Sequence, residues 1–107
     1  MSAAFGVDLI EIKKARRFYR SHKDRLNSFF SPREITFIHK NKNPHENLAV
    51  LLASKEALFK AAPCFGTGLA AFREHKLMLQ KKTPAQSAFK FSVLKNKKYV
   101  VVQCVGI

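Results

Sequence analysis

The final stretch, residues 99–107, constrains the fold more than any other part of this sequence. It reads YVVVQCVGI, in which almost every side chain is apolar and three consecutive valines favour an extended backbone. A run of this kind is typical of a strand in the interior of a sheet. A second candidate strand lies at residues 88–94, and only the polar stretch 95–98 separates the two. We therefore expect a β-hairpin whose second strand is central.

The opening of the chain is predicted to supply another strand. Residues 3–12 read AAFGVDLIEI and are rich in aliphatic side chains. Asp8 interrupts this apolar run, and a lone carboxylate in such a strand needs a physical reason. Residues 76–80 form one further candidate strand.

Two helices are predicted directly after the opening strand. Residues 13–26 have the pattern of a basic helix that turns Ala15 and Phe18 inward. A second helix begins at Ser31, because Pro32 suits the first helical position and Glu34 completes a capping box with the serine. Residues 41–44 are expected to end that helix.

A third helix is predicted at residues 47–62, where Pro63 and Gly66 end it. Its apolar positions recur at helical spacing and are Leu48, Leu51, Leu52, Leu58 and Phe59. The order of strand, helices and strands predicts an α+β fold. A length of 107 residues, without repeats or a low-complexity linker, predicts one domain over residues 1–107.

The charge of the chain favours polyanionic partners. Twenty Lys and Arg residues stand against seven Asp and Glu residues, which gives a formal net charge of +13. Such a field attracts nucleic acids, anionic membranes, polyphosphate cofactors and acidic proteins alike, so charge alone does not choose among them. Two cysteines, Cys64 and Cys104, make no disulfide framework and are expected to be reduced. With no leader and no membrane span in the sequence, a cytoplasmic location is expected.

Three side chains are candidates for chemistry. Asp8 on a strand and Glu56 on a helix could converge on one Mg²⁺ ion, which takes one or two protein carboxylates together with phosphates and waters. Lys60 stands four residues after Glu56, and its ammonium could bind a phosphate beside that ion. The alternative readings are ordinary: Asp8 caps the next helix, Glu56 is solvated, and Glu56 and Lys60 form a surface pair.

A glycine-rich turn follows the third helix. Gly66, Thr67 and Gly68 could let backbone N–H groups approach a phosphate, although Gly66 could equally serve only to end the helix. The four histidines and two cysteines show no spacing typical of a zinc site.

Taken in order, these segments resemble the small holo-acyl-carrier-protein synthases of the 4′-phosphopantetheinyl transferase superfamily. The opening strand GVDLIEI is similar to the first motif of that family, and Ser31-x-x-Glu34 to its second. Leu48-Ala49 with the later KEALFKA stretch resembles its third, followed by the glycine turn. Tyr99, Gln103 and Val105 are similar to its closing strand.

The resemblance implies an activity and a site. Members of the family move phosphopantetheine from coenzyme A to a serine of an apo acyl carrier protein and release 3′,5′-ADP. Matched by motif, Asp8 and Glu56 hold magnesium, and Lys60 contacts the phosphates of coenzyme A beside the turn at Gly66–Gly68. Either Glu56 or a water on the metal would serve as the base for the serine.

The resemblance also implies partners. The basic first helix of the family docks the acidic carrier protein, and the matching residues here are Lys13, Lys14, Arg16, Arg17 and Arg20. Family members are typically trimers with active sites at subunit interfaces. The family fold is a sheet packed against helices, in keeping with the α+β prediction.

The chain departs from the family pattern at several positions. Leu51 stands where an arginine is usual, and residues 62–65 lengthen the spacing before the glycine turn. Two further hypotheses follow. One is an inactive relative that binds the carrier protein without a metal, and the other is a small basic module that binds nucleic acid through stacked phenylalanines.

Overall fold

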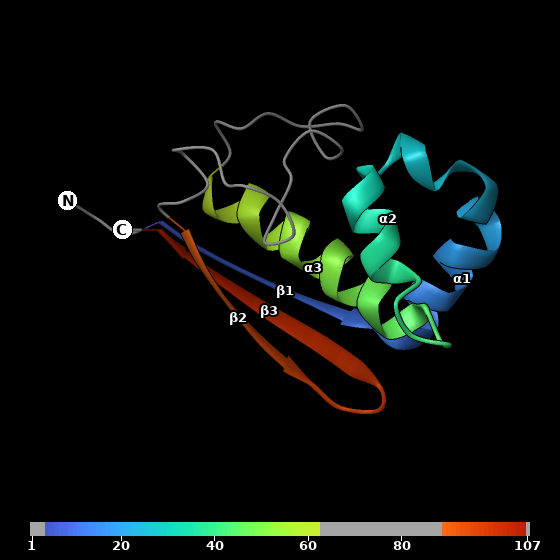
Figure 1. The fold of residues 1–107 in the computed structure, drawn as a ribbon. Coiled ribbons are helices and arrows are strands. Elements are labelled where there is room, and N and C mark those ends of the chain that lie inside the picture. The colour runs from blue at the N-terminus through green and yellow to red at the C-terminus, as the bar shows by residue number, and fades with distance from the viewer. Residues whose placement is uncertain (1–3, 63–88, 107) are drawn as a thin grey trace.

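The structure is a computed structural model, and it describes residues 4–62 and 89–106. One layer is a three-stranded sheet, and helices cover one of its two faces (Figure 1). The elements are β1 (Phe5–Glu11), α1 (Ile12–His22), a 3₁₀ helix (Lys23–Ser28), α2 (Pro32–Ile38), α3 (His45–Ala61), β2 (Phe89–Lys95) and β3 (Tyr99–Gly106). The α+β prediction is confirmed.

The sheet has the order β1-β3-β2, and both pairs are antiparallel. β3 is therefore the central strand, as its apolar sequence predicts, and β2 and β3 form the expected hairpin. The register places Asp8 opposite Val102, near the middle of β1. The predicted strand at residues 76–80 lies outside the described residues.

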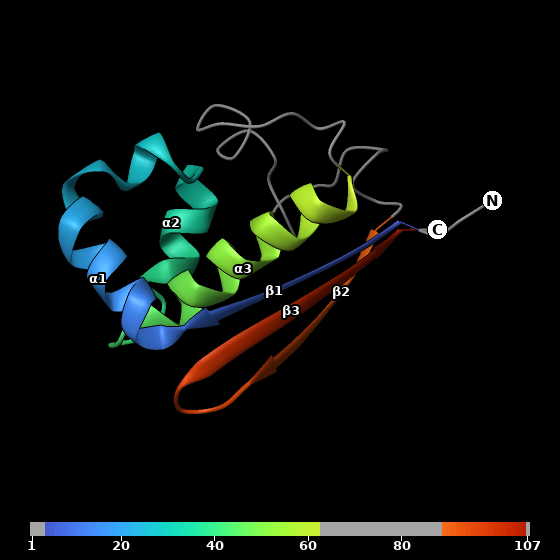
Figure 2. The same ribbon diagram turned by 180° about the vertical axis from the view of Figure 1, so that it is seen from behind.

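α3 packs along the sheet, where it contacts β1 and β3, and it also contacts α1 and α2 (Figure 2). Its apolar residues Leu48, Leu51 and Leu58 are fully buried against Val100 and Val102 of β3. Leu52 and Phe59 are only partly buried. α3 begins at His45, two residues before the predicted start, because the side chain of Asn43 accepts a hydrogen bond from the backbone N–H of His45 at 2.9 Å. None of the described helices is long and apolar enough to cross a membrane.

The prediction of one continuous helix over residues 13–26 is wrong. α1 ends at His22, and the chain continues as a 3₁₀ helix in which Arg25 leaves helical geometry at φ −134° and ψ 26°. The break lets Phe29 return to α1, where its ring meets Phe18 edge to face at 5.0 Å. Ala15 is fully buried as predicted, whereas Phe18 is only half-buried.

The start of α2 forms as the sequence predicts. The hydroxyl of Ser31 accepts the backbone N–H of Glu34 at 3.3 Å, and Glu34 Oε1 accepts the N–H of Ser31 at 2.9 Å. Both orphan donors at the helix start are thereby satisfied.

Candidate active site

The centre of the site is an ion pair between Asp8 and Lys60. Lys60 Nζ lies 2.9 Å from Asp8 Oδ1 and also donates to the carbonyl oxygen of Val7 at 3.1 Å. The two residues come from the middle of β1 and the last turn of α3. Asp8 keeps 20% of its side-chain surface and Lys60 keeps 55%, so the pair opens to solvent and can meet a ligand.

This geometry excludes one of the two interpretations of Asp8. The N-cap residue of α1 is Glu11, with no side-chain cap, and the Asp8 carboxylate bonds Lys60 instead. Asp8 is therefore not a helix cap. The surface pair between Glu56 and Lys60 is also not formed among the described residues, because Lys60 reaches across to β1.

Gly6 is the reason that β1 can come so close to α3. A Cβ atom placed on Gly6 would overlap the carbonyl oxygen of Ala57 and lie 2.7 Å from the backbone N of Ala61. Only a residue without a side chain allows this contact between strand and helix backbones. The close approach brings Asp8, two residues later, within reach of Lys60.

Glu56 lies one helical turn before Lys60, and positions four apart share one face of a helix. Its side chain is exposed and has no ion-pair partner among the described residues. Asp8 and Glu56 together offer two carboxylates, which fits the number that Mg²⁺ takes from proteins. In the part of the chain that the structure describes, no group of three or more His, Cys, Asp or Glu side chains converges. Gly66, Thr67 and Gly68 lie outside the described residues.

A second ion pair lies behind this face of α3, and the sequence analysis did not predict it. Lys55 Nζ is 3.0 Å from Glu34 Oε1, and both side chains are fully buried. The ammonium also lies 5.3 Å from the centre of the Phe30 ring. A signal was present in the sequence, because Lys55 falls on the apolar stripe of α3 between Leu51 and Leu58. The lysine directly before Glu56 therefore belongs to the core.

The basic residues of α1 form a surface. Their side chains are all exposed and make no ion pair within the described residues; they are Lys13, Lys14, Arg16, Arg17 and Arg20. Tyr19 of α1 contacts His45 at the start of α3, and the centres of their rings lie 5.7 Å apart. Burial, and then Arg16 and Arg20, lower the pKa of His45 below its usual 6.5.

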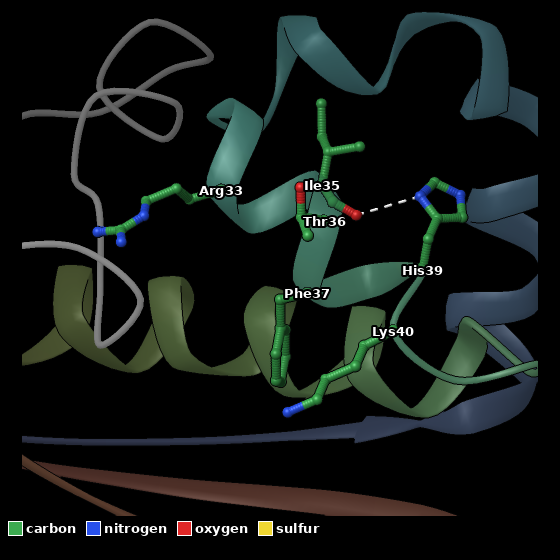
Figure 3. A pocket seen from close by; sticks show the side chains of 6 residues that line it. All are labelled: Arg33, Ile35, Thr36, Phe37, His39 and Lys40. Atoms are coloured by element: carbon green, nitrogen blue, oxygen red, sulfur yellow. Dashed lines mark hydrogen bonds between the residues drawn. The ribbon is translucent and has the colours of Figure 1, made fainter.

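One cavity that described residues line lies along α2, and none of Asp8, Glu56 and Lys60 is among its lining residues. It has a volume of about 910 Å³ (Figure 3). Its lining residues all come from α2 and its end, and they are Arg33, Ile35, Thr36, Phe37, His39 and Lys40. His39 Nδ1 is held by the carbonyl oxygen of Ile35 at 3.1 Å. The site predicted from the sequence and this cavity share no residue.

Comparisons with known proteins agree with the motifs. The sequence model of the 4′-phosphopantetheinyl transferase superfamily matches residues 4–104. A holo-[acyl-carrier-protein] synthase from Chlamydia muridarum is 42% identical over 65 residues, which cover 60% of this chain and 50% of that protein. Another from Clostridium perfringens is 42% identical over 73 residues, 67% of this chain and 52% of that protein. The chain spans about half the length of the curated relatives it matches.

The fold is shared with solved structures as well. A holo-(acyl-carrier-protein) synthase from Bacillus anthracis, in complex with CoA (3′,5′-ADP), superposes with a TM-score of 0.76 at 20% identity. The match covers 96% of this chain and 94% of that one. At this identity the likeness establishes the fold alone. The family itself follows from the sequence model, whose match takes in β1, all the described helices and most of β3: this chain belongs to the 4′-phosphopantetheinyl transferase superfamily.

Proposed function

We propose that this chain transfers 4′-phosphopantetheine from coenzyme A to a serine of an apo acyl carrier protein and releases 3′,5′-ADP. The observation that carries the proposal is the meeting of Asp8 and Lys60, 52 residues apart in sequence, on a face of α3 that also carries Glu56. A ligand with a pyrophosphate would find an ammonium and two carboxylates there.

Asp8 and Glu56 are the residues that would hold Mg²⁺, since both offer exposed or part-exposed carboxylate oxygens. When bound, the ion supplies charge neutralisation for the pyrophosphate and its leaving oxygen. Magnesium and coenzyme A are thus the proposed cofactor and co-substrate.

The roles of the side chains follow from their charges. The serine oxygen forms a bond to the phosphorus that carries the pantetheine arm, and the bond from that phosphorus to the oxygen of 3′,5′-ADP breaks. Negative charge grows on the leaving oxygen, and Lys60 can turn from Asp8 toward it because its side chain is more than half exposed. The serine proton must pass to a base, and Glu56 is a carboxylate on the same face that can accept it.

The open face of the sheet supports a proposal on assembly. β1 and the hairpin place large apolar side chains on the face away from α3, including Leu9 at 57%, Phe5 at 57% and Leu94 at 75% exposure. Exposed apolar patches of this kind mark interaction sites. We propose a homotrimer that covers this face, with a mass of three times 12.2 kDa in analytical ultracentrifugation. A single species of 12.2 kDa at micromolar concentration would contradict the trimer.

The buried, free Cys104 is compatible with a reducing cytoplasm as the place of action.

Intact-mass spectrometry tests the transfer. Apo acyl carrier protein is incubated with this protein, coenzyme A and Mg²⁺, and a gain of one phosphopantetheine arm is expected. Chelator, Asp8→Asn and Glu56→Gln should each abolish the gain, whereas the surface variant Arg33→Gln on α2 should keep it. No gain with several acidic carrier proteins, from a folded protein, would refute the transfer and favour an inactive carrier-binding relative.

A further inference from the structure

The turn between β2 and β3 carries two lysines on a preformed backbone. Asn96 Oδ1 accepts hydrogen bonds from the backbone N–H groups of Lys98 and Tyr99, both at 2.8 Å. The backbone N–H of Asn96 donates to the carbonyl oxygen of Tyr99 at 3.0 Å. The side chains of Lys97 and Lys98 project from this turn, are exposed and make no ion pair with described residues.

The hairpin turn is fixed to the beginning of α1. The backbone N–H of Ile12, the first residue of α1, donates to the carbonyl oxygen of Lys98 at 2.8 Å. Glu11 lies opposite Tyr99 in the sheet register, so α1 starts beside the end of the hairpin (Figure 1). The two segments are 80 residues or more apart in sequence, and the fold brings their cations to one place.

A cleft of about 330 Å³ is lined by residues of both segments. Four of its lining residues are cations, Lys13 and Arg16 from α1 and Lys97 and Lys98 from the hairpin; the others are Glu11, Ile12 and Tyr99. The cations thus stand on both walls, and two largely apolar side chains lie between them. A flat cationic surface would lack this apolar part.

The chemistry of the cleft fits an acidic helix better than a nucleic acid. Lys13, Arg16 and Arg20 follow one another at steps of three and four residues, or about 4.5–6 Å along the axis of α1. Carboxylates on one face of a partner helix repeat at the same spacing. An apolar side chain between such carboxylates can enter the space beside Ile12 and Tyr99. A phosphate backbone itself offers no apolar group to the space beside Ile12 and Tyr99.

We propose that Lys97 and Lys98 form the second wall of a composite docking cleft, in which α1 and the hairpin turn together hold an acidic helix of the carrier protein. This inference rests on the proposed function, since it extends the docking surface of α1. It adds two residues from the other end of the chain to the recognition of the substrate protein. Because the hairpin also contains the central strand of the sheet, docking on it would connect the partner rigidly to the strand next to Asp8.

Binding of apo acyl carrier protein, measured by fluorescence anisotropy, tests the composite cleft. The double variant K97E/K98E should weaken binding roughly tenfold at about 50 mM salt, since each exposed pair contributes up to about 1 kcal/mol and reversal adds repulsion. The effect should shrink at about 300 mM salt because exposed charges are screened. R33E, a charge reversal at an exposed position of α2, is the control and should change affinity less than about twofold.

Two further arms separate the possible failures. If K97E/K98E binds like the unaltered protein while R16E/R17E loses affinity, the second wall is refuted and docking on α1 stands. If neither pair matters, the docking on α1 that the family resemblance implies fails as well, while the transfer reaction is tested separately by intact-mass spectrometry. A single-stranded oligonucleotide that binds as tightly as the carrier, and responds equally to K97E/K98E, would replace the acidic helix with a generic polyanion. Unchanged circular dichroism and coenzyme A binding of K97E/K98E would show that the variant is folded.

Discussion

Replacement of Lys55 by Met should cost more stability than any surface change in this protein. The substitution keeps much of the volume of the side chain but leaves the carboxylate of Glu34 buried without its cation. Glu34 Oε1 would retain only the backbone N–H of Ser31, and Glu34 Oε2 has no hydrogen-bond partner among the described residues. Breaking a buried pair in this way costs about 3–5 kcal/mol, out of about 5–15 kcal/mol for a whole domain.

Urea unfolding, followed by circular dichroism at a fixed protein concentration, measures this cost. With a slope of about 1.5 kcal/mol per molar urea, K55M should lower the midpoint by roughly 2 M or more. The double variant E34Q/K55M should recover most of the loss, because the buried charge is gone and the introduced amide oxygen can still accept the N–H of Ser31. The exposed control K40M should stay within about 0.5 kcal/mol of the unaltered protein.

Two results would refute the reasoning. A loss below about 1 kcal/mol for K55M would mean that the carboxylate of Glu34 finds water or another donor when Lys55 is removed. Additive losses in E34Q/K55M would mean that the two side chains are not energetically coupled. Either outcome would mean that the ion pair between Glu34 of α2 and Lys55 of α3 does not stabilise the packing of these two helices.

Three further predictions concern single positions. Gly6→Ala should destabilise the protein by about 1–3 kcal/mol in urea unfolding, since the methyl group overlaps the carbonyl oxygen of Ala57; a neutral result would mean that β1 can move away from α3. Because folding lowers the pKa of His45, the free energy of unfolding should be highest above about pH 6.5 and should fall as the pH drops below that value. In H45Q the urea midpoint should change less with pH below about 6.5 than in the unaltered protein. An equal dependence of the midpoint on pH in both proteins would contradict the assignment. Burial raises the pKa of Cys104 to about 11, so in a C64S background the thiol should react with a disulfide reagent only on unfolding; fast labelling of the folded protein at about pH 8 would oppose this.

The local signals in the sequence predicted most of the fold. The capping box at Ser31 and Glu34 involves neighbouring residues, so its geometry follows from the local pattern. The central place of β3 followed from its apolar sequence, because a strand with few polar positions is stabilised by neighbours on both sides. The break after His22 was missed, since it depends on the contact between Phe29 and Phe18 rather than on any helix-ending residue.

The site required contacts that no local pattern contains. The spacing of four residues suggested Glu56 as the ion-pair partner of Lys60. In the structure Lys60 instead pairs with Asp8 of β1. Glu34 and Lys55 are likewise 21 residues apart. The sequence pattern explained Glu34 as part of the capping box and predicted no partner for Lys55. Pairs of this kind can be predicted only when the packing of α3 against both the sheet and α2 is known.

The family pattern has an arginine where this chain has Leu51, and the burial of Leu51 indicates a role in packing. Leu51 is fully buried within the apolar core, so an arginine there would have to carry its charge out past packed side chains. The leucine therefore contributes to packing, and of the described cations only Lys60 contacts Asp8. In the proposed reaction the pyrophosphate accordingly depends on Lys60 and on the ion held by the two carboxylates. Of the fifteen other cations among the described residues, seven lie exposed on α1 and the hairpin turn, where the proposed docking cleft would use them for an acidic protein rather than a nucleotide.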